Sequence, residues 1–202
     1  MKLYDYFRSS AAFRVRIALN LKGLSCEQIP VDLRLAEQSQ ADYTAINPQG
    51  LVPALVVDKG ILNQSLAIIE WLEESYPQSP LLPESAWDRA RVRAMAYTVA
   101  CDIHPLNNLR VLNYLKGELD VSEEEKMAWY HHWIHEGFQA LEQQVEAAPF
   151  CFGSQPTMAD LCLVPQIYNA IRFKVDLTHY PRLTSIWEYC MSLKEFGSAA
   201  PE

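Results

Sequence analysis

Short strand-like runs of apolar residues alternate with longer helix-like runs in the first third of the chain. The predicted strands are residues 2–6, 26–31, 51–58 and 61–63. The predicted helices are residues 10–22, 65–76 and a short irregular one at 35–45. In the first helix Phe13 and Ile17 repeat at a spacing of four, and Gly23 is placed to end it. The predicted order is therefore β-α-β-α-β-β-α.

The remainder of the chain shows only helical patterns, after a proline-rich linker at residues 77–84. The predicted helices are residues 85–116, 122–148, 157–172 and 182–194. Thr157 and Asp160 open the third of these in a capping arrangement. The pattern predicts an α/β domain over residues 1–80 and an all-helical domain over residues 85–202.

Composition and charge restrict the class of protein. Half of the 202 residues are apolar, which is typical of a folded globular protein. The apolar stretches are too short to span a membrane, and the chain runs directly into a strand pattern, which predicts a cytoplasmic protein without a membrane partner. A net charge of −8 argues against nucleic acid as a partner. An anionic ligand would therefore need a local positive field.

The cysteines and histidines suggest no metal site. Five cysteines without a C-x-x-C spacing predict buried free thiols in a reducing compartment. His131 and His135 have the i, i+4 spacing of metal ligands on a helix. Because no third ligand accompanies them, exposed helix-face histidines and no bound metal are predicted.

The stretch YFRSSAAFRVRIALNLKG, residues 6–23, holds a serine pair where a strand gives way to a helix. Arginines surround Ser9 and Ser10 at positions 8, 14 and 16. A helix start presents unpaired N–H groups and partial positive charge, and a hydroxyl there can donate a hydrogen bond to an anion. Simple capping of the helix explains most such serines, so this motif alone indicates little.

Two further motifs favour ligand binding only in combination with the serine pair. Pro53 enters a strand, and a cis Val52-Pro53 bond would expose the backbone of Val52 to a ligand, although trans is far commoner. Gln64 and Ser65 open the 65–76 helix, with Ser65 placed as its N-cap and an amide-rich start suited to a carboxylate. All three motifs would meet at one edge of a sheet.

The chain resembles the zeta class of glutathione transferases over essentially its whole length. The motifs that carry the resemblance are YFRSSAAFRVRIALNLKG, AINPQGLVPAL, NQSLAIIEWLEE, DIHPLNNLRVL, TMADLCLVPQ and RFKVDLTHYP. The class has cysteine after its serine pair, whereas this chain has Ala11. A role for that thiol as a nucleophile is therefore excluded here, but the role of the serines is not.

The resemblance implies a thioredoxin-like N-terminal domain, an all-α C-terminal domain and glutathione as the cofactor. It implies that Ser9 and Ser10 receive the glutathione thiolate and that Gln38 lies near the glycyl end of the peptide. It further implies that Val52, beside a cis Pro53, pairs its backbone with the cysteinyl residue.

The same resemblance assigns the other end of glutathione and the substrate. Gln64 and Ser65 would hold the γ-glutamyl carboxylate, and His104 and Asn108 would line the cofactor site from the helical domain. The implied substrate ligands are Arg8, Arg110 and Arg172, the last also acting in catalysis.

The implied activity is cis–trans isomerisation of maleylacetoacetate in tyrosine or phenylalanine degradation by a homodimer acting on a small dicarboxylate. Addition of the thiolate to the cis double bond would allow rotation, and glutathione would be regenerated. Maleylpyruvate isomerase remains an alternative, as does a transferase for small electrophiles such as α-halo acids. A non-catalytic glutathione-binding protein is a third class, which the intact serine, Val-Pro and Gln-Ser motifs disfavour.

Overall fold

The computed structural model describes residues 1–201, which form two compact units. The first unit comprises Met1–Leu81 together with the C-terminal segment from Met191, and the helical unit is Leu82–Cys190. The sequence prediction placed the whole C-terminus in the helical domain. In the structure its last residues pack within the first unit instead.

The first unit contains a mixed four-stranded sheet in the order β2-β1-β3-β4. The strands are β1 (Lys2–Asp5), β2 (Glu27–Pro30), β3 (Ala54–Val57) and β4 (Gly60–Asn63). β1 pairs with β2 in parallel, whereas β1 with β3 and β3 with β4 are antiparallel. The predicted order of strands and helices is confirmed, and most of the strands are shorter than predicted.

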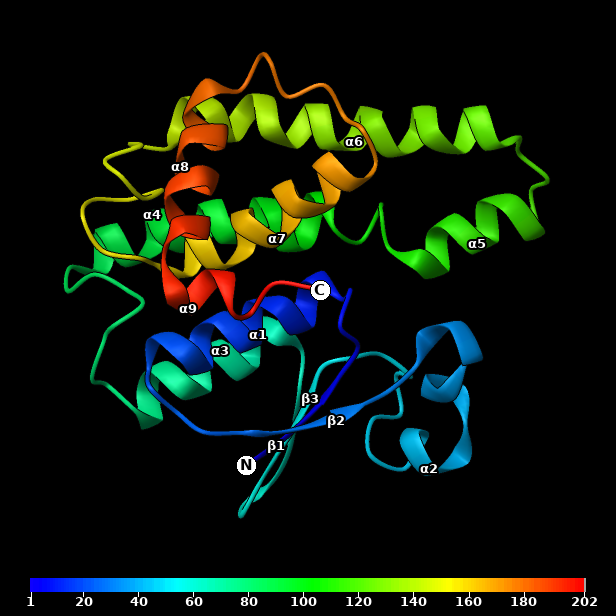
Figure 1. Cartoon of the computed structure of the whole chain (residues 1–202), viewed down its shortest axis with the longest axis horizontal. Coiled ribbons are helices and arrows are strands. Elements are labelled where there is room, and N and C mark those ends of the chain that lie inside the picture. The colour runs from blue at the N-terminus through cyan, green and yellow to red at the C-terminus, as the bar shows by residue number, and fades with distance from the viewer. Residues whose placement is uncertain (202) are drawn as a thin grey trace. The chain divides into compact units, whose positions relative to one another are not determined.

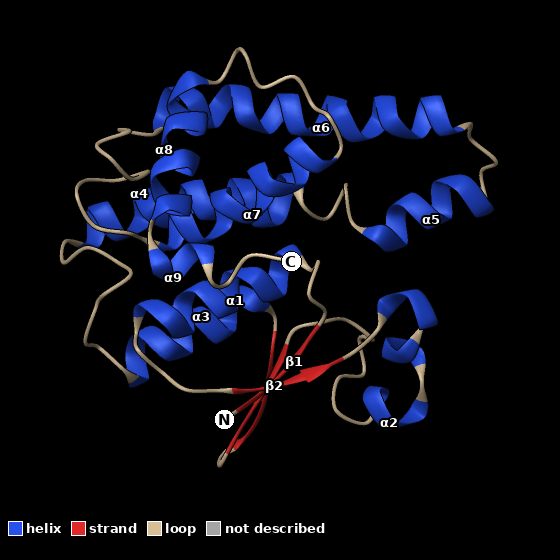
Figure 2. Ribbon diagram, viewed as in Figure 1, coloured by secondary structure: helices blue, strands red, loops and turns tan. Residues whose placement is uncertain are grey.

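Two helices of the first unit lie together on one side of the sheet, and a short one lies on the other (Figures 1 and 2). The pair is α1 (Ser10–Leu21) and α3 (Ser65–Ser75), and the short helix is α2 (Ala41–Thr44). The single irregular helix predicted at 35–45 is instead two 3₁₀ turns, at Leu33–Leu35 and Glu37–Ser39, followed by α2.

Helix α1 is buried on every side, because all residues from Ala12 to Leu19 are buried. Arg16 lies among them, and each nitrogen of its guanidinium group donates a hydrogen bond. It forms an ion pair with Asp5 at 2.6 Å and donates to the carbonyl oxygens of Phe7, at 3.0 Å, and Ala199, at 2.8 Å. The last contact joins the C-terminal segment, which includes α9 (Lys194–Gly197), to the first unit.

The helical unit is built from α4 (Ala86–Tyr97), α5 (Leu109–Gly117), α6 (Glu123–Gln144), α7 (Met158–Arg172) and α8 (Pro181–Ser192). The single helix predicted at 85–116 is wrong, because a π-helical turn at Thr98–Ile103 and an irregular segment separate α4 from α5. Gly137 of α6 allows the π turn to pack closely, since a Cβ there would lie 2.2 Å from the Ile103 side chain.

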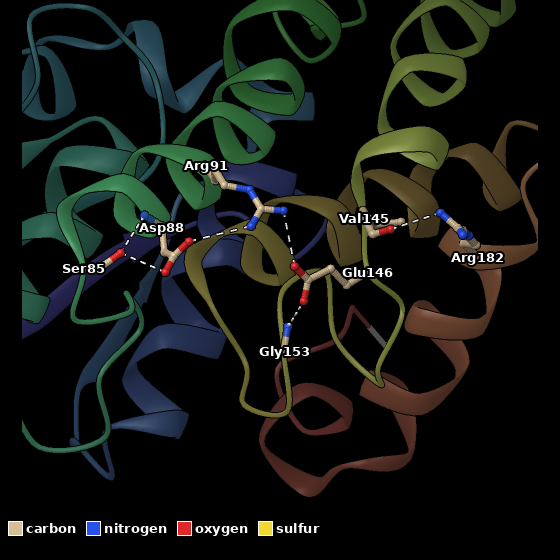
Figure 3. A network of polar contacts seen from close by, with 7 residues as sticks. All are labelled: Ser85, Asp88, Arg91, Val145, Glu146, Gly153 and Arg182. Atoms are coloured by element: carbon tan, nitrogen blue, oxygen red, sulfur yellow. Dashed lines mark hydrogen bonds and ion pairs between the residues drawn. The ribbon is translucent and has the colours of Figure 1, made fainter.

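A polar network ties α4 to the end of α6 (Figure 3). Arg91 lies 3.7 Å from an Asp88 oxygen and 3.3 Å from an oxygen of Glu146. Glu146 in turn accepts a hydrogen bond from the Gly153 amide at 3.0 Å. Because the side chains of Arg91, Asp88 and Glu146 are about one-third exposed or more, this network contributes little to stability and mainly orders the segment after α6.

The start of α7 is closed by a buried carboxylate. Asp160 is 0% exposed and accepts hydrogen bonds from the Cys151 amide at 2.7 Å and from the Thr157 amide and hydroxyl at 2.7 and 2.9 Å. Burial raises the pKa of Asp160, and these donors oppose that shift. The predicted capping arrangement is confirmed.

Two expectations about single residue types need correction. Cys101 is exposed and Cys26 is half-buried, so only the other three cysteines are the buried free thiols that were predicted. His131 and His135 are not exposed, because one bonds the Phe173 carbonyl at 2.9 Å and the other the Tyr180 hydroxyl at 2.8 Å.

Two features are absent from residues 1–201. Within that range no cluster of histidine, cysteine and acidic side chains is able to hold a metal ion. Among the described helices, none combines the length and apolar character needed to cross a membrane.

Candidate active site

The start of α1 places one hydroxyl in a position to bind an anion. Ser9 is the N-cap, and its hydroxyl oxygen accepts a hydrogen bond from the Ala12 amide at 3.2 Å. This contact uses a lone pair and leaves the hydroxyl proton available, since no acceptor within residues 1–201 takes it. Ser10 is the first residue of the helix and is buried. Capping is therefore correct for Ser9, and it is compatible with donation to a ligand.

The start of α3 is open, and the expectation that Ser65 caps it is wrong. The N-cap is Gln64, which has a φ of 68° and makes no capping hydrogen bond, because its side chain donates to Gln49 Oε1 at 2.8 Å. Ser65 is the first residue of the helix, and its hydroxyl accepts from Arg14 Nη1 at 3.3 Å. In the described part of the chain no acceptor faces the amides of Ser65, Leu66 and Ala67.

The segment before β3 is buried, and hydrogen bonds to its backbone hold it in place. The Val52-Pro53 peptide bond is cis, as the resemblance implies, and both residues are buried. The carbonyl of Leu51 accepts from the Tyr43 hydroxyl and from Asn47 Nδ2, both at 2.6 Å. Burial raises the pKa of Tyr43 to about 12, so its hydroxyl stays protonated and keeps donating at neutral pH.

Gln38 lies next to this segment. It belongs to the 3₁₀ turn Glu37–Ser39, and its carbonyl oxygen is only 3.0 Å from where a Cβ of Gly50 would stand. Gly50 has a φ of 61°, which also favours glycine. The buried Gln38 Oε1 has no hydrogen-bond partner among residues 1–201. The contacts of Gly50 and Gln49 thus bring the predicted residues Gln38 and Gln64 to the same stretch of chain as Val52.

In the helical unit, the predicted residues His104 and Asn108 flank a tight turn. His104 ends the π-helical turn and is half-buried, and π-helical turns often mark functional sites. Asn108 is the N-cap of α5 and accepts from the Arg110 amide at 3.0 Å. The turn is held by Trp129 of α6, whose indole N–H donates to the Leu106 carbonyl at 2.8 Å.

Arg172 is the last residue of α7 and is exposed. The next residue, Phe173, packs on Tyr130 with ring centroids 4.3 Å apart, and its carbonyl contacts His131. Residues 129–131 of α6 therefore anchor both the 104–108 turn and the end of α7. The sequence prediction missed this role of α6, although the WYHHW run was visible.

The three arginines that the resemblance implies as substrate ligands form no ion pair with a carboxylate of the described residues. Arg8 and Arg172 rest over the rings of Phe7 and Phe173, at 4.9 and 5.0 Å from the ring centroids. All three, including Arg110, are exposed, and none forms an ion pair within the described chain. The surface ion pairing that usually explains exposed arginines does not apply to them.

Two residues that contribute to the candidate site were not singled out by their sequence pattern. Gln49 orients Gln64, and Arg14 contacts Ser65. Arg14 was visible as one of the arginines around the serine pair, but nothing in the local pattern indicated its contact 51 residues away. Its position follows from the packing of α1 beside α3.

Comparison with known proteins agrees with this architecture. Residues 3–80 match the family model described as glutathione S-transferase, N-terminal domain, and residues 134–190 match glutathione S-transferase, C-terminal domain. A relative from Vibrio cholerae, described as a probable maleylacetoacetate isomerase, is 49% identical over 99% of this chain and 95% of its own. The chain belongs to the glutathione S-transferase family, and its similarity is to the zeta class.

Two solved structures are similar over the full length. The holo structure of a maleylpyruvate isomerase, described as a bacterial zeta-class glutathione S-transferase, is 48% identical, with a TM-score of 0.96 over 100% of this chain and 97% of that one. A maleylacetoacetate isomerase from Methylobacterium extorquens AM1, with bound malonate and glutathione, is 41% identical. Its TM-score is 0.96 over 100% of this chain and 96% of that chain. The fold is thus the glutathione transferase fold, with a thioredoxin-like first unit.

The residues present fit glutathione, which carries two carboxylates and a thiol. Neither α1 nor α3 has an acidic residue in its first turn; α5 and α8 share this feature, whereas α4, α6 and α7 each have at least one. The starts of α1 and α3 therefore keep their positive partial charge for a ligand. Unpaired amides and a free hydroxyl proton supply the hydrogen-bond donors that anionic groups require.

Proposed function

We propose that this protein is a glutathione-dependent cis–trans isomerase that converts maleylacetoacetate to fumarylacetoacetate in tyrosine and phenylalanine degradation. The names of its relatives support this reaction. The observation that carries the proposal is the state of Ser9, whose hydroxyl caps an acid-free helix start with its lone pair and keeps its proton for an anion.

The first unit would hold the cofactor along its whole length. Ser65, with the open amides of α3 and the side chain of Gln64, would bind the γ-glutamyl carboxylate. The backbone of Val52 beside cis Pro53 would pair with the cysteinyl residue, and Gln38 would lie at the glycyl end. His104 and Asn108 would line the site from the helical unit.

When bound, glutathione supplies a thiol whose reversible addition to the cis double bond of the substrate permits rotation about that bond. Ser9 would favour the ionised form of this thiol by donating its proton, assisted by the positive end of α1. Lowering a thiol pKa by about two units requires roughly 2.7 kcal/mol of preferential stabilisation. A charge-assisted hydrogen bond and a helix start together supply energy of this order.

The uncommitted arginines would provide the positive charge that a doubly anionic substrate needs in an acidic protein. Arg172 and Arg110 would bind the substrate carboxylates and stabilise negative charge that develops on its oxo group. Arg8, adjacent to Ser9 in the sequence, would contribute from the first unit. The bound malonate in the Methylobacterium structure supports a site for a small dicarboxylate.

Maleylpyruvate isomerisation is the second candidate, and the 48% identity to a structure of that name favours it. The chemistry is the same on a shorter oxo acid, so the same residues would serve. Transferase activity on small electrophiles such as α-halo acids would use the same activated thiol. The proposal also includes a homodimer in the cytoplasm, as the resemblance to the family implies.

Isomerase assays on purified protein test the proposed function directly. Maleylacetoacetate and maleylpyruvate should each be followed with and without glutathione. We expect turnover that depends on glutathione, with the larger kcat/KM on maleylacetoacetate. Equal or better use of maleylpyruvate would favour the second candidate, and glutathione binding without turnover on either acid would revive the non-catalytic class.

The role of Ser9 is tested by comparing Ser9→Ala with Ser10→Ala. Ser9→Ala should slow isomerisation more than tenfold at neutral pH and move the pH profile of kcat upward, because the bound thiol loses its hydroxyl donor. Ser10→Ala should have the smaller effect. Normal isomerisation by the double alanine variant at neutral pH would show that neither serine activates the thiol.

Substitution of the three arginines tests whether the protein is an isomerase of diacids or a general transferase. Arg172→Met should strongly impair isomerisation of the diacid and spare conjugation of a neutral electrophile such as chlorodinitrobenzene. Arg110→Met should show a weaker form of the same split, and Arg8→Met the weakest. Lys174→Met, which removes an exposed cation two residues from Arg172, should change neither activity. Equal losses on both substrates would contradict carboxylate binding and favour a broad-specificity transferase.

A further inference from the structure

Arg14 is a buried cation that has no anionic partner among residues 1–201. Its side chain belongs to α1, and the residue is only 2% exposed. Within residues 1–201 its one hydrogen bond runs from Nη1 to the hydroxyl oxygen of Ser65 at 3.3 Å. No acceptor among residues 1–201 bonds its Nε or Nη2, although both atoms are fully buried.

The neighbouring Arg16 shows what a satisfied buried arginine looks like in the same helix. Arg16 is 7% exposed, and it pairs with both oxygens of Asp5 and two carbonyls. Removing a guanidinium from water is costly unless a counter-charge and hydrogen bonds replace the lost hydration. Arg16 has this compensation within the chain, whereas Arg14 lacks it. The charge of Arg14 is therefore retained at a cost to the ligand-free protein.

The one group in the described part of the chain that Arg14 bonds lies at the open end of α3. Ser65 accepts from Arg14, so its own proton can be donated only elsewhere, and no described residue takes it. The amides of Ser65, Leu66 and Ala67 are also without acceptors in residues 1–201. An uncapped helix start, a hydroxyl proton without an acceptor and a buried guanidinium without a counter-charge all favour negative charge at the same place.

We propose that Arg14 is a positioning residue for the γ-glutamyl carboxylate of glutathione, acting through Ser65. The guanidinium bonds the Ser65 oxygen, which commits the Ser65 proton to the carboxylate. It also supplies the full positive charge that the partial charges of the helix start lack. This inference rests on the proposed glutathione cofactor, but it is independent of which acid is isomerised.

Two measurable consequences follow from the unpaired charge. Arg14→Met is close to Arg in volume and removes the buried charge, so the ligand-free variant should unfold at a denaturant concentration equal to or higher than that of the wild type. The same variant should bind S-methylglutathione about tenfold or more weakly, because the carboxylate loses a nearby buried positive charge and the Ser65 proton is no longer directed toward it. Binding by calorimetry and unfolding by denaturant measure both without turnover.

An analogue whose γ-glutamyl α-carboxylate is replaced by a carboxamide separates electrostatics from general damage to the site. The wild type should prefer S-methylglutathione over this amide by a large factor. Arg14→Met should lower that preference about tenfold and leave binding of the amide nearly unchanged. Arg34→Met, which removes an exposed charge from the same unit, should alter neither quantity.

The outcomes distinguish the inference from the proposed function. Full retention of the carboxylate preference in Arg14→Met overturns the role of Arg14 alone and indicates that buried water satisfies its free nitrogens. A wild type that binds no S-methylglutathione overturns the cofactor and this inference together. If Arg14→Met fails to fold, Arg14→Lys provides the test, because a point charge without the guanidinium fork should keep stability and lose part of the preference.

Discussion

The starts of α3 and α7 solve the same problem in opposite ways. Both helices begin inside a compact unit, and the buried backbone amides around each start need acceptors. α7 has Asp160, a fully buried carboxylate that accepts from two backbone amides and the Thr157 hydroxyl. α3 has no capping hydrogen bond, no acidic residue in its first turn, and Arg14 in place of a carboxylate.

The difference shows how a helix start built for stability is distinguished from one built for a ligand. At α7 the chain supplies both the donors and the anion, so the site is closed. At α3 the chain supplies only donors and positive charge, and the missing anion has to come from outside. We therefore expect substitutions at α7 to change folding, and substitutions at α3 to change glutathione binding.

The largest effect is expected at the closed start. Asp160→Ala should lower the free energy of unfolding by on the order of 3 kcal/mol, because buried amides lose a charged acceptor. Glutathione affinity of the folded fraction should not change. Asp88→Ala is the matched control, since Asp88 has the same position in α4 but lies near the surface, and it should cost about 1 kcal/mol or less. Similar losses for both variants, by denaturant unfolding, would remove the contrast.

The open start should respond in the opposite way. Ser65→Ala should weaken glutathione binding by about 1–2 kcal/mol, because a carboxylate loses a hydrogen-bond donor. The saturated rate should stay nearly constant, since this contact is far from the reacting thiol. Ser85→Ala, which removes the N-cap of α4, should lower stability by about 1 kcal/mol and leave binding unchanged. A large fall in the saturated rate of Ser65→Ala with normal affinity would contradict a purely binding role.

Gln64, which precedes the open start of α3, has a strained backbone conformation. Its φ of 68° and ψ of 116° are unfavourable for a residue with a side chain. Gln64→Gly should therefore raise the free energy of unfolding by about 1 kcal/mol, after the entropic cost of glycine is deducted, while glutathione binding weakens. Thermal unfolding of wild type and variant, each with and without glutathione, would measure both effects. The variant should have the higher Tm without glutathione and the smaller increase in Tm when glutathione is added. Lower stability together with normal binding would mean that the strain serves the fold.

The smallest effect is expected at a third kind of helix start, which is fully solvated. Glu123 opens α6, and hydrogen bonds from Lys116 and Lys126 lower its pKa to about 2. A depressed carboxyl pKa contributes stability that is present above the ordinary value of 4.5 and is lost as pH falls toward 2. Glu123→Gln should slightly flatten the fall in stability over that interval. A slope equal to that of the wild type would show that solvent screens the pair completely.

Local signals determined the elements that depend on near neighbours. The β-α-β-α-β-β-α order and the Thr157–Asp160 cap are both present where periodicity and capping chemistry predicted them. Ser9 was likewise expected at the start of α1. These features follow from hydrogen bonds between residues three or four positions apart, or between adjacent strands, so a short window of sequence contains their cause.

Tertiary packing decided the features that depend on distant residues. Gln64 rather than Ser65 occupies the N-cap position of α3, and neither side chain caps the helix. Their side chains instead contact Gln49 and Arg14, which lie 15 and 51 residues away in the sequence. The C-terminal segment joins the first unit through Arg16, 183 residues from Ala199. Two arginines of one helix look alike in the sequence, but only the fold supplies Asp5 to one and an open helix start to the other. The energetic cost and the role of a buried charge depend on the groups that surround it, and only folding brings those distant groups together.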